Sequence, residues 1–153
     1  MSLDIIMGNM FSGKTSELIR QLKRYKIIGS KILVINSSQD TRSNEEVLKT
    51  HDNVTFKCLK TNSLLSILNE PLFHEAEVIA IDEAQFFVNL KAFAEECLLQ
   101  NKNVLMAGLD GDYKQRKFGE MLDCIPMADT VKKLKALCTK CNNGTLGPFT
   151  VRI

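Results

Sequence analysis

Gly8-Asn9-Met10-Phe11-Ser12-Gly13-Lys14-Thr15 is the stretch that decides the fold of this chain. It follows an apolar run at 3–7 and leads into a segment with helical spacing at 16–22. A strand, a G-x-x-x-x-G-K-[ST] loop and a helix in this order form a phosphate-binding loop. Its backbone N–H groups can point at phosphate oxygens, Lys14 can reach the β- and γ-phosphates, and the Thr15 hydroxyl can hold Mg²⁺. We therefore expect residues 8–15 to bind a nucleoside triphosphate. The alternative is a glycine-rich turn before a helix.

Apolar segments alternate with amphipathic ones along the 153 residues. The spacing predicts strands at 3–7, 31–35, 54–59, 78–81 and 103–109, and helices at 15–28, 63–68, 90–100 and 121–125. We read 36–52 as a long polar loop and expect 130–137 to return to the sheet. Such alternation predicts an α/β fold with a parallel sheet and flanking helices. With the phosphate loop, the fold class is a P-loop NTPase of the RecA-like type.

Composition argues for one soluble globular domain, with 44% hydrophobic and 25% charged residues and a net charge of +2. The short basic clusters at 114–117 and 132–135 are read as solvated faces, so no nucleic-acid partner is expected. No apolar stretch approaches the roughly 20 residues that span a bilayer, and the N-terminus does not resemble a signal peptide. Five scattered cysteines favour a reducing compartment. The expected location is the cytoplasm, without a membrane partner.

A second nucleotide-site signal is the apolar run 78–81 followed by Asp82 and Glu83. An Asp that ends a buried strand is where a Mg²⁺ ligand belongs in enzymes with a phosphate loop. Glu83 should lie at the same carboxyl edge of the sheet and could accept a proton from an attacking hydroxyl or water. Its alternative reading is a solvated residue at the start of a helix.

These residues resemble the type II thymidine kinases, the family of the human cytosolic and poxviral enzymes. The resemblance rests on motifs that follow one another in family order along the whole chain. After the phosphate loop and Glu17-Leu18 they are Asp40-Thr41-Arg42, Thr50-His51-Asp52, Ile81-Asp82-Glu83-Ala84-Gln85-Phe86-Phe87, Gly108-Leu109-Asp110-Gly111-Asp112-Tyr113, Phe118-Gly119, Ile125-Pro126 and Cys138-Thr139-Lys140-Cys141. Asn9 stands where the family usually has Pro.

The resemblance implies a role for each matched position. Residues 8–15, with Asp40, Arg42, Asp82 and Gln85, would surround the triphosphate, with Mg²⁺ on Thr15 and Asp82 and Glu83 as the general base on the nucleoside 5′-hydroxyl. The nucleoside pocket would comprise Met10, Phe86, Leu109, Tyr113, Phe118 and Thr150. Aromatic faces at Phe86 and Tyr113 suit a flat neutral base, although each aromatic taken alone would more often be a core residue.

The cysteines divide into two groups. Cys58, Cys97 and Cys124 fall in expected strands or helices and are read as small core hydrophobes. Cys138 and Cys141 form half of a zinc site, because two thiolates at this spacing can share one tetrahedral Zn²⁺. In the family the second pair lies beyond the position where this sequence stops, so we expect only the start of a zinc and lasso subdomain. The expected units are therefore 1–137, the kinase domain, and 138–153.

The resulting hypothesis is a thymidine kinase that transfers the ATP γ-phosphate to the 5′-hydroxyl of thymidine, with deoxyuridine as a second candidate acceptor, for dTTP salvage and DNA synthesis. Its partners would be ATP and thymidine, and the family forms homo-oligomers, as tetramers. One alternative is a P-loop ATPase or a kinase for another small alcohol. The other is a nucleotide-binding short form with impaired catalysis, since most of the loop that covers the nucleoside is missing from the sequence.

Overall fold

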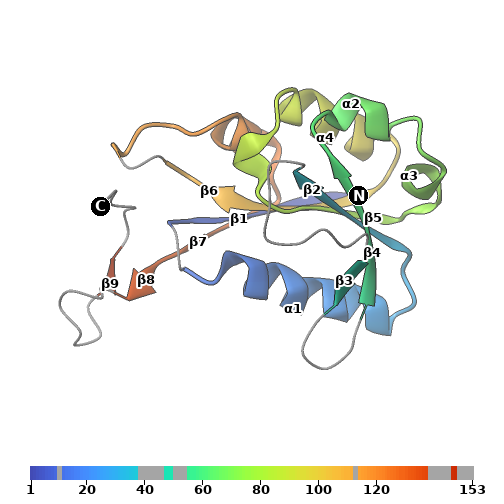
Figure 1. Cartoon of the computed structure of the whole chain (residues 1–153), viewed down its shortest axis with the longest axis horizontal. Helices are drawn as coiled ribbons and strands as arrows, with labels where there is room; N and C mark the ends of the chain where they lie inside the picture. The colour runs from blue at the N-terminus through green and yellow to red at the C-terminus, as the bar shows by residue number, and fades with distance from the viewer. Residues whose placement is uncertain (10–11, 38–46, 50–54, 112–113, 138–145, 148–153) are drawn as a thin grey trace.

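A twisted, mainly parallel sheet organises the chain (Figure 1). The computed structural model describes residues 1–9, 12–37, 47–49, 55–111, 114–137 and 146–147. Within these residues, seven strands form one sheet in the order β3-β4-β2-β5-β6-β1-β7. Their bounds are β1 (Ser2–Gly8), β2 (Ile32–Ser37), β3 (Val47–Lys49), β4 (Thr55–Thr61), β5 (Val78–Ile81), β6 (Asn103–Leu109) and β7 (Thr130–Leu134). All neighbours run parallel except β3, which is antiparallel to β4.

Helices cover both faces of this sheet, which confirms the predicted α/β class. The helix α1 (Lys14–Ile27) packs on one face, and the other face carries α2 (Leu64–Ile67), α3 (Pro71–Glu75), α4 (Leu90–Leu99) and the 3₁₀ helices η1 (Ala84–Phe86) and η2 (Met121–Met127) (Figure 1). Because strand side chains alternate, Ile5 joins the core under α4 while Ile6 joins the core under α1. Each strand therefore contributes to two apolar cores.

The apolar runs of the sequence form the central strands β5 and β6. All four residues of β5 are fully buried, as expected for a parallel strand covered on both faces. In β6, residues 104–107 are likewise fully buried. Burying one such aliphatic side chain stabilises the fold by roughly 1.5–3 kcal/mol. These strands therefore stabilise the sheet whose strand ends carry the predicted nucleotide-site residues.

A glycine ends α1. Gly29 has φ 81°, a left-handed conformation that costs glycine little. Its N–H donates to the carbonyl of Lys26, and the N–H of Ser30 donates to the carbonyl of Tyr25, which is the Schellman arrangement. The chain thereby turns directly from α1 into β2, as the Gly29-Ser30 pair predicts.

Three predictions about elements are wrong in part. The segment 36–52 is not all loop, because β2 continues to Ser37 and Val47–Lys49 pairs with β4 as an edge strand. The expected strand 130–137 divides in two: β7 joins the sheet, whereas β8 (Ala136–Leu137) pairs antiparallel with β9 (Leu146–Gly147). The helix expected at 121–125 is a 3₁₀ helix that runs through Pro126 to Met127. The helix α3 was missed.

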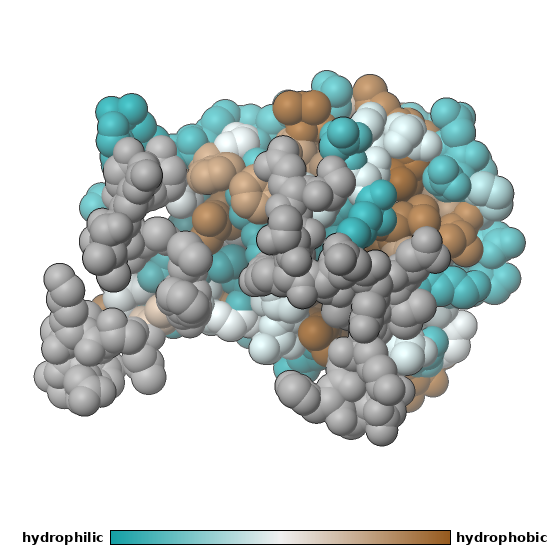
Figure 2. All heavy atoms as spheres, viewed as in Figure 1, coloured by the Kyte–Doolittle hydropathy of each residue, from teal (hydrophilic) through white to brown (hydrophobic). Residues whose placement is uncertain are grey.

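The cysteines at 58, 97 and 124 are buried, as predicted for core residues. Burial raises the pKa of the Cys97 thiol to about 12 and that of Cys124 to about 11, so both stay protonated. Exposed apolar side chains are scattered over separate elements, and Figure 2 shows them interspersed with hydrophilic ones. None of the helices among the described residues combines the length and apolar character needed to cross a membrane.

Candidate nucleotide-binding site

Three strands deliver the predicted site residues to one edge of the sheet. The phosphate loop follows β1, Asp82 follows β5, and β6 ends at Leu109, which pairs with Gly8. In the sheet, β6 lies between β5 and β1. In open parallel sheets, ligands bind at the carboxyl ends of the strands. The loop and the acidic residues therefore meet where such a fold places its ligand.

In the described part of the loop, two side chains bond to a backbone carbonyl of the loop itself. The Asn9 carbonyl oxygen accepts hydrogen bonds from Lys14 Nζ and from the Ser12 hydroxyl, each at 2.7 Å. The ammonium of Lys14 thus lies over the loop, where an entering phosphate could attract it. The Asn9 side chain points elsewhere: its amide contacts the small β8–β9 sheet. Any phosphate contact from this residue therefore falls to its backbone.

A hydroxyl and a carboxylate meet across the site. Thr15 Oγ1 donates to Asp82 Oδ2 at 3.4 Å, and Asp82 Oδ1 accepts from the backbone N–H of Glu83 at 2.9 Å. Thr15 lies in the first turn of α1 and Asp82 directly follows β5, so the pair joins two elements that are far apart in sequence. Oxygen ligands of this kind suit Mg²⁺, which commonly takes one or two protein ligands together with substrate phosphates and water. The two side chains fit the predicted magnesium position.

Glu83 adopts a strained backbone beside this pair, with φ 51° at a non-glycine residue. The turn carries the chain from β5 into η1 and brings Gln85 back towards Glu83. Gln85 Nε2 donates to Glu83 Oε2 at 2.7 Å, and Gln85 Oε1 accepts from the N–H of Leu109 at 3.0 Å. Gln85 is only 3% exposed. A buried amide that is bonded at both ends therefore orients the carboxylate that we expect to act as the base.

Two glycines make room for Gln85. A Cβ on Gly108 would lie 2.5 Å from Gln85 Oε1, and a Cβ on Gly119 would lie 2.4 Å from the Gln85 carbonyl oxygen. Gly119 also has φ 68°. Both glycines belong to the motifs of the sequence resemblance, but no role was predicted for either. Their role follows from their contact with Gln85, which sequence spacing does not reveal.

The described residues include part of the predicted nucleoside pocket. Phe86 is 38% exposed, and its ring packs edge-on against Phe118 with centroids 5.9 Å apart. Leu109 is half-buried at the end of β6. The Phe86 side chain, three residues after Glu83, is therefore partly open to solvent while it packs on Phe118. The remaining predicted site residues lie outside the described part of the chain: Met10, Phe11, Asp40, Arg42, Tyr113, Cys138, Cys141 and Thr150.

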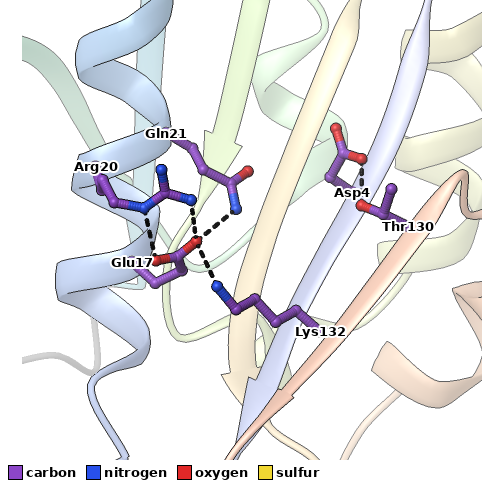
Figure 3. Close-up of polar contacts among 6 residues, drawn as sticks. All are labelled: Asp4, Glu17, Arg20, Gln21, Thr130 and Lys132. Atoms are coloured by element: carbon purple, nitrogen blue, oxygen red, sulfur yellow. Dashed lines mark hydrogen bonds and ion pairs between the residues drawn. The ribbon is translucent and has the colours of Figure 1, made fainter.

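The first turn of α1 is fixed to the edge strand by Glu17 (Figure 3). Its carboxylate accepts hydrogen bonds from Arg20, Gln21 and Lys132. The Arg20 guanidinium, followed by these other donors, holds the pKa of Glu17 well below its usual range, although partial burial opposes the shift. Thr130 Oγ1 on β7 donates a hydrogen bond to Asp4 on the neighbouring strand β1. The helix that follows the phosphate loop is therefore tied to β7, and β7 to β1.

Other features lie away from this edge. A cavity of about 410 Å³, lined by residues including Lys26, Lys31 and Phe56, involves the opposite ends of β2 and β4 and shares no residue with the candidate site. Among the described residues, no three or more His, Cys, Asp or Glu side chains are grouped to hold a metal ion. That finding does not bear on the Thr15–Asp82 pair, which has one carboxylate.

Comparison with known proteins places this geometry in a family. A family model described as thymidine kinase matches residues 1–153. The chain belongs to the thymidine kinase family. It is 40% identical to thymidine kinase a of Arabidopsis thaliana, over 99% of this chain and 64% of that protein. It is also 40% identical to the fowlpox virus thymidine kinase (92% of this chain, 78% of that protein) and to the cytosolic thymidine kinase of Cricetulus griseus (91% and 58%).

This family membership confirms the resemblance seen in the sequence, and it makes the chain a member of a kinase family with a phosphate loop. The chain spans about three fifths of the plant and hamster relatives and about three quarters of the viral one. Among solved structures, a DNA replication initiation factor is similar in fold, with a TM-score of 0.51, 13% identity, and coverage of 91% of this chain and 41% of that one. At that identity, only the fold is shared.

Proposed function

We propose that this chain binds ATP with Mg²⁺ and transfers the γ-phosphate to the 5′-hydroxyl of thymidine, with deoxyuridine as a second acceptor, in dTTP salvage for DNA synthesis. The observation that carries the proposal is the Thr15–Asp82 contact beside a Glu83 whose carboxylate is held by Gln85. Thr15 and Asp82 are a magnesium position, and Glu83 is a base next to it. A simple ATP hydrolase would not need the exposed aromatic edge at Phe86.

The residues divide the work of phosphoryl transfer, which is mainly positioning and neutralisation of charge. Lys14 would leave the Asn9 carbonyl and contact the β- and γ-phosphates. Thr15 and Asp82 would hold Mg²⁺, which neutralises charge on the phosphates when it is bound. Glu83 would accept the proton of the 5′-hydroxyl as that oxygen attacks the γ-phosphorus. Phe86 and Phe118 would present aromatic surface to the base.

Several parts of the proposal rest on the family rather than on the described residues. They are phosphate contacts by Asp40 and Arg42, nucleoside contacts by Met10, Tyr113 and Thr150, a structural Zn²⁺ on Cys138 and Cys141, a homotetramer and a cytoplasmic location. The family's enzymes supply the reason for each.

The decisive test is the Glu83→Gln variant. We expect its ATP affinity to stay within about twofold of the parent, because Glu83 is not proposed to contact phosphate, whereas thymidine phosphorylation should fall by at least about 100-fold, as is typical when a general base is lost. The measurements are calorimetric titration with ATP and transfer of radiolabelled phosphate to deoxynucleosides. Equal transfer by variant and parent would remove Glu83 as the base. ATP consumption by the parent without any phosphorylated nucleoside would favour the hydrolase alternative.

A further inference from the structure

The Asn9 side chain spans two parts of the molecule that are far apart in sequence. Its Nδ2 donates to the Gly147 carbonyl at 2.7 Å, and its Oδ1 accepts from the Ala136 N–H at 3.2 Å. Ala136 and Gly147 are directly opposite each other in the small β8–β9 sheet. One amide therefore bonds to both strands of that sheet. The residue is 5% exposed, so water does not readily replace these partners.

The backbone of the same residue organises the phosphate loop. Its carbonyl oxygen is the acceptor for both Lys14 Nζ and the Ser12 hydroxyl. The preceding residue is packed just as closely, because a Cβ on Gly8 would lie 2.6 Å from the Leu134 carbonyl oxygen at the end of β7. Movement of the β8–β9 sheet would therefore move the Asn9 peptide, and with it the point where Lys14 is held.

We propose that Asn9 couples the phosphate loop to the β8–β9 sheet, so that nucleotide in the loop and order in the small sheet stabilise each other. Asn9 is a positioning residue, because its side chain acts on Lys14 through the Asn9 carbonyl and touches no reacting atom. Coupling of this kind is reciprocal: if the small sheet strengthens nucleotide binding, nucleotide stabilises the small sheet by the same factor. The inference rests on the proposed binding of ATP at this loop.

The test uses Asn9→Leu, which keeps the branched shape and the number of side-chain heavy atoms but removes both hydrogen bonds, and Asn9→Ala as a second variant. The matched control is Asn103→Ala, which removes a side-chain bond to Ser2 at the opposite edge of the sheet. For each full-length protein, ATP affinity is measured by calorimetry, and hydrogen exchange of the Ala136 amide is measured by NMR with and without Mg²⁺-ATP. Thermal unfolding identifies any variant that has lost its fold.

In the parent and in Asn103→Ala, we expect ATP to slow exchange at the Ala136 amide. Asn9→Leu should bind ATP at least about fivefold more weakly, the lower end of typical coupling between sites, and its Ala136 exchange should no longer respond to ATP. Parent-like ATP affinity in a folded Asn9→Leu would overturn the inference, as would an unchanged response at Ala136. A parent protein that binds no ATP would instead overturn the proposed function, and the coupling with it.

Discussion

Gln85 holds the expected base, Glu83, in one orientation, which the sequence motifs alone do not show. The resemblance places Gln85 among the residues around the triphosphate and predicts no contact with Glu83. Its buried amide is bonded to the Glu83 carboxylate and to the Leu109 N–H, and Gly108 and Gly119 leave the space that the Gln85 side chain and backbone occupy. The rotamer of the expected base is thus set by groups that follow it by 2 to 36 residues in sequence.

We predict that Gln85→Ala lowers kcat for thymidine phosphorylation about fivefold, because a base that loses one orienting hydrogen bond, worth roughly 1 kcal/mol, spends less time aligned with the hydroxyl. The KM for ATP should change little, since Gln85 bonds to Glu83 rather than to the loop. Steady-state kinetics provide the measurement. Gln100→Ala, which removes an exposed Gln–Glu bond on α4, is the matched control and should leave kcat unchanged. An unaltered kcat in Gln85→Ala would show that Glu83 needs no such support.

Among the elements, α1 and β7 depend on each other through charge. Glu17 on α1 is bonded to Lys132 on β7 and to Arg20 on its own helix. A carboxylate whose pKa is lowered on folding contributes stability that is present above its unfolded pKa, near 4.5, and is lost as pH falls towards the folded value. The contribution of Glu17 should therefore be complete at pH 7 and decline below about pH 4.5.

We predict that Glu17→Gln is less stable than the parent at pH 7 and that the difference shrinks as pH is lowered through 4.5 towards 2, since the parent carboxylate then becomes neutral as well. Urea unfolding of both proteins across this range gives the difference in the free energy of unfolding. Glu95→Gln, at an exposed position on α4, serves as the reference for loss of a carboxylate without this network. A difference that grew at low pH would contradict the assignment.

How far sequence could predict the elements depended on their length and periodicity. The buried runs of β5 and β6 and the ten residues of α4 were found because their patterns persist. β3 has three residues within a polar segment, and α3 has five residues beginning at Pro71. Neither is long enough to show the periodic apolar pattern by which a strand or helix is predicted. The β8–β9 pairing depends on contacts that local patterns do not contain. For the same reason, the phosphate loop was recognised but the direction of the Asn9 side chain was not.

For the molecule as a whole, stability comes from two apolar cores separated by the sheet. Phe93 on α4 is fully buried in the core that also contains Phe73, and the two ring centroids are 5.8 Å apart. We predict that Phe93→Ala lowers the free energy of unfolding by about 3–5 kcal/mol, the usual cost of removing a buried ring. The midpoint of urea unfolding is the measurement. Leu99→Ala, at a position 78% exposed on the same helix, should cost less than about 0.5 kcal/mol. Similar losses in both variants would mean that the packing of α4 is wrongly described.

The position of β1 in the sheet also has a consequence for how the protein is made. β1 is the first of the described strands in the order of synthesis, but its two neighbours are β6 and β7, whose residues are about 100 and 126 positions later in the chain. Until residue 134 has emerged, the strand that carries the phosphate loop lacks a partner on one side. We therefore expect the phosphate loop to gain its full support from the sheet only after β7 has left the ribosome. Before that point, a nascent chain that carries the complete phosphate-loop motif should not yet hold the proposed nucleotide.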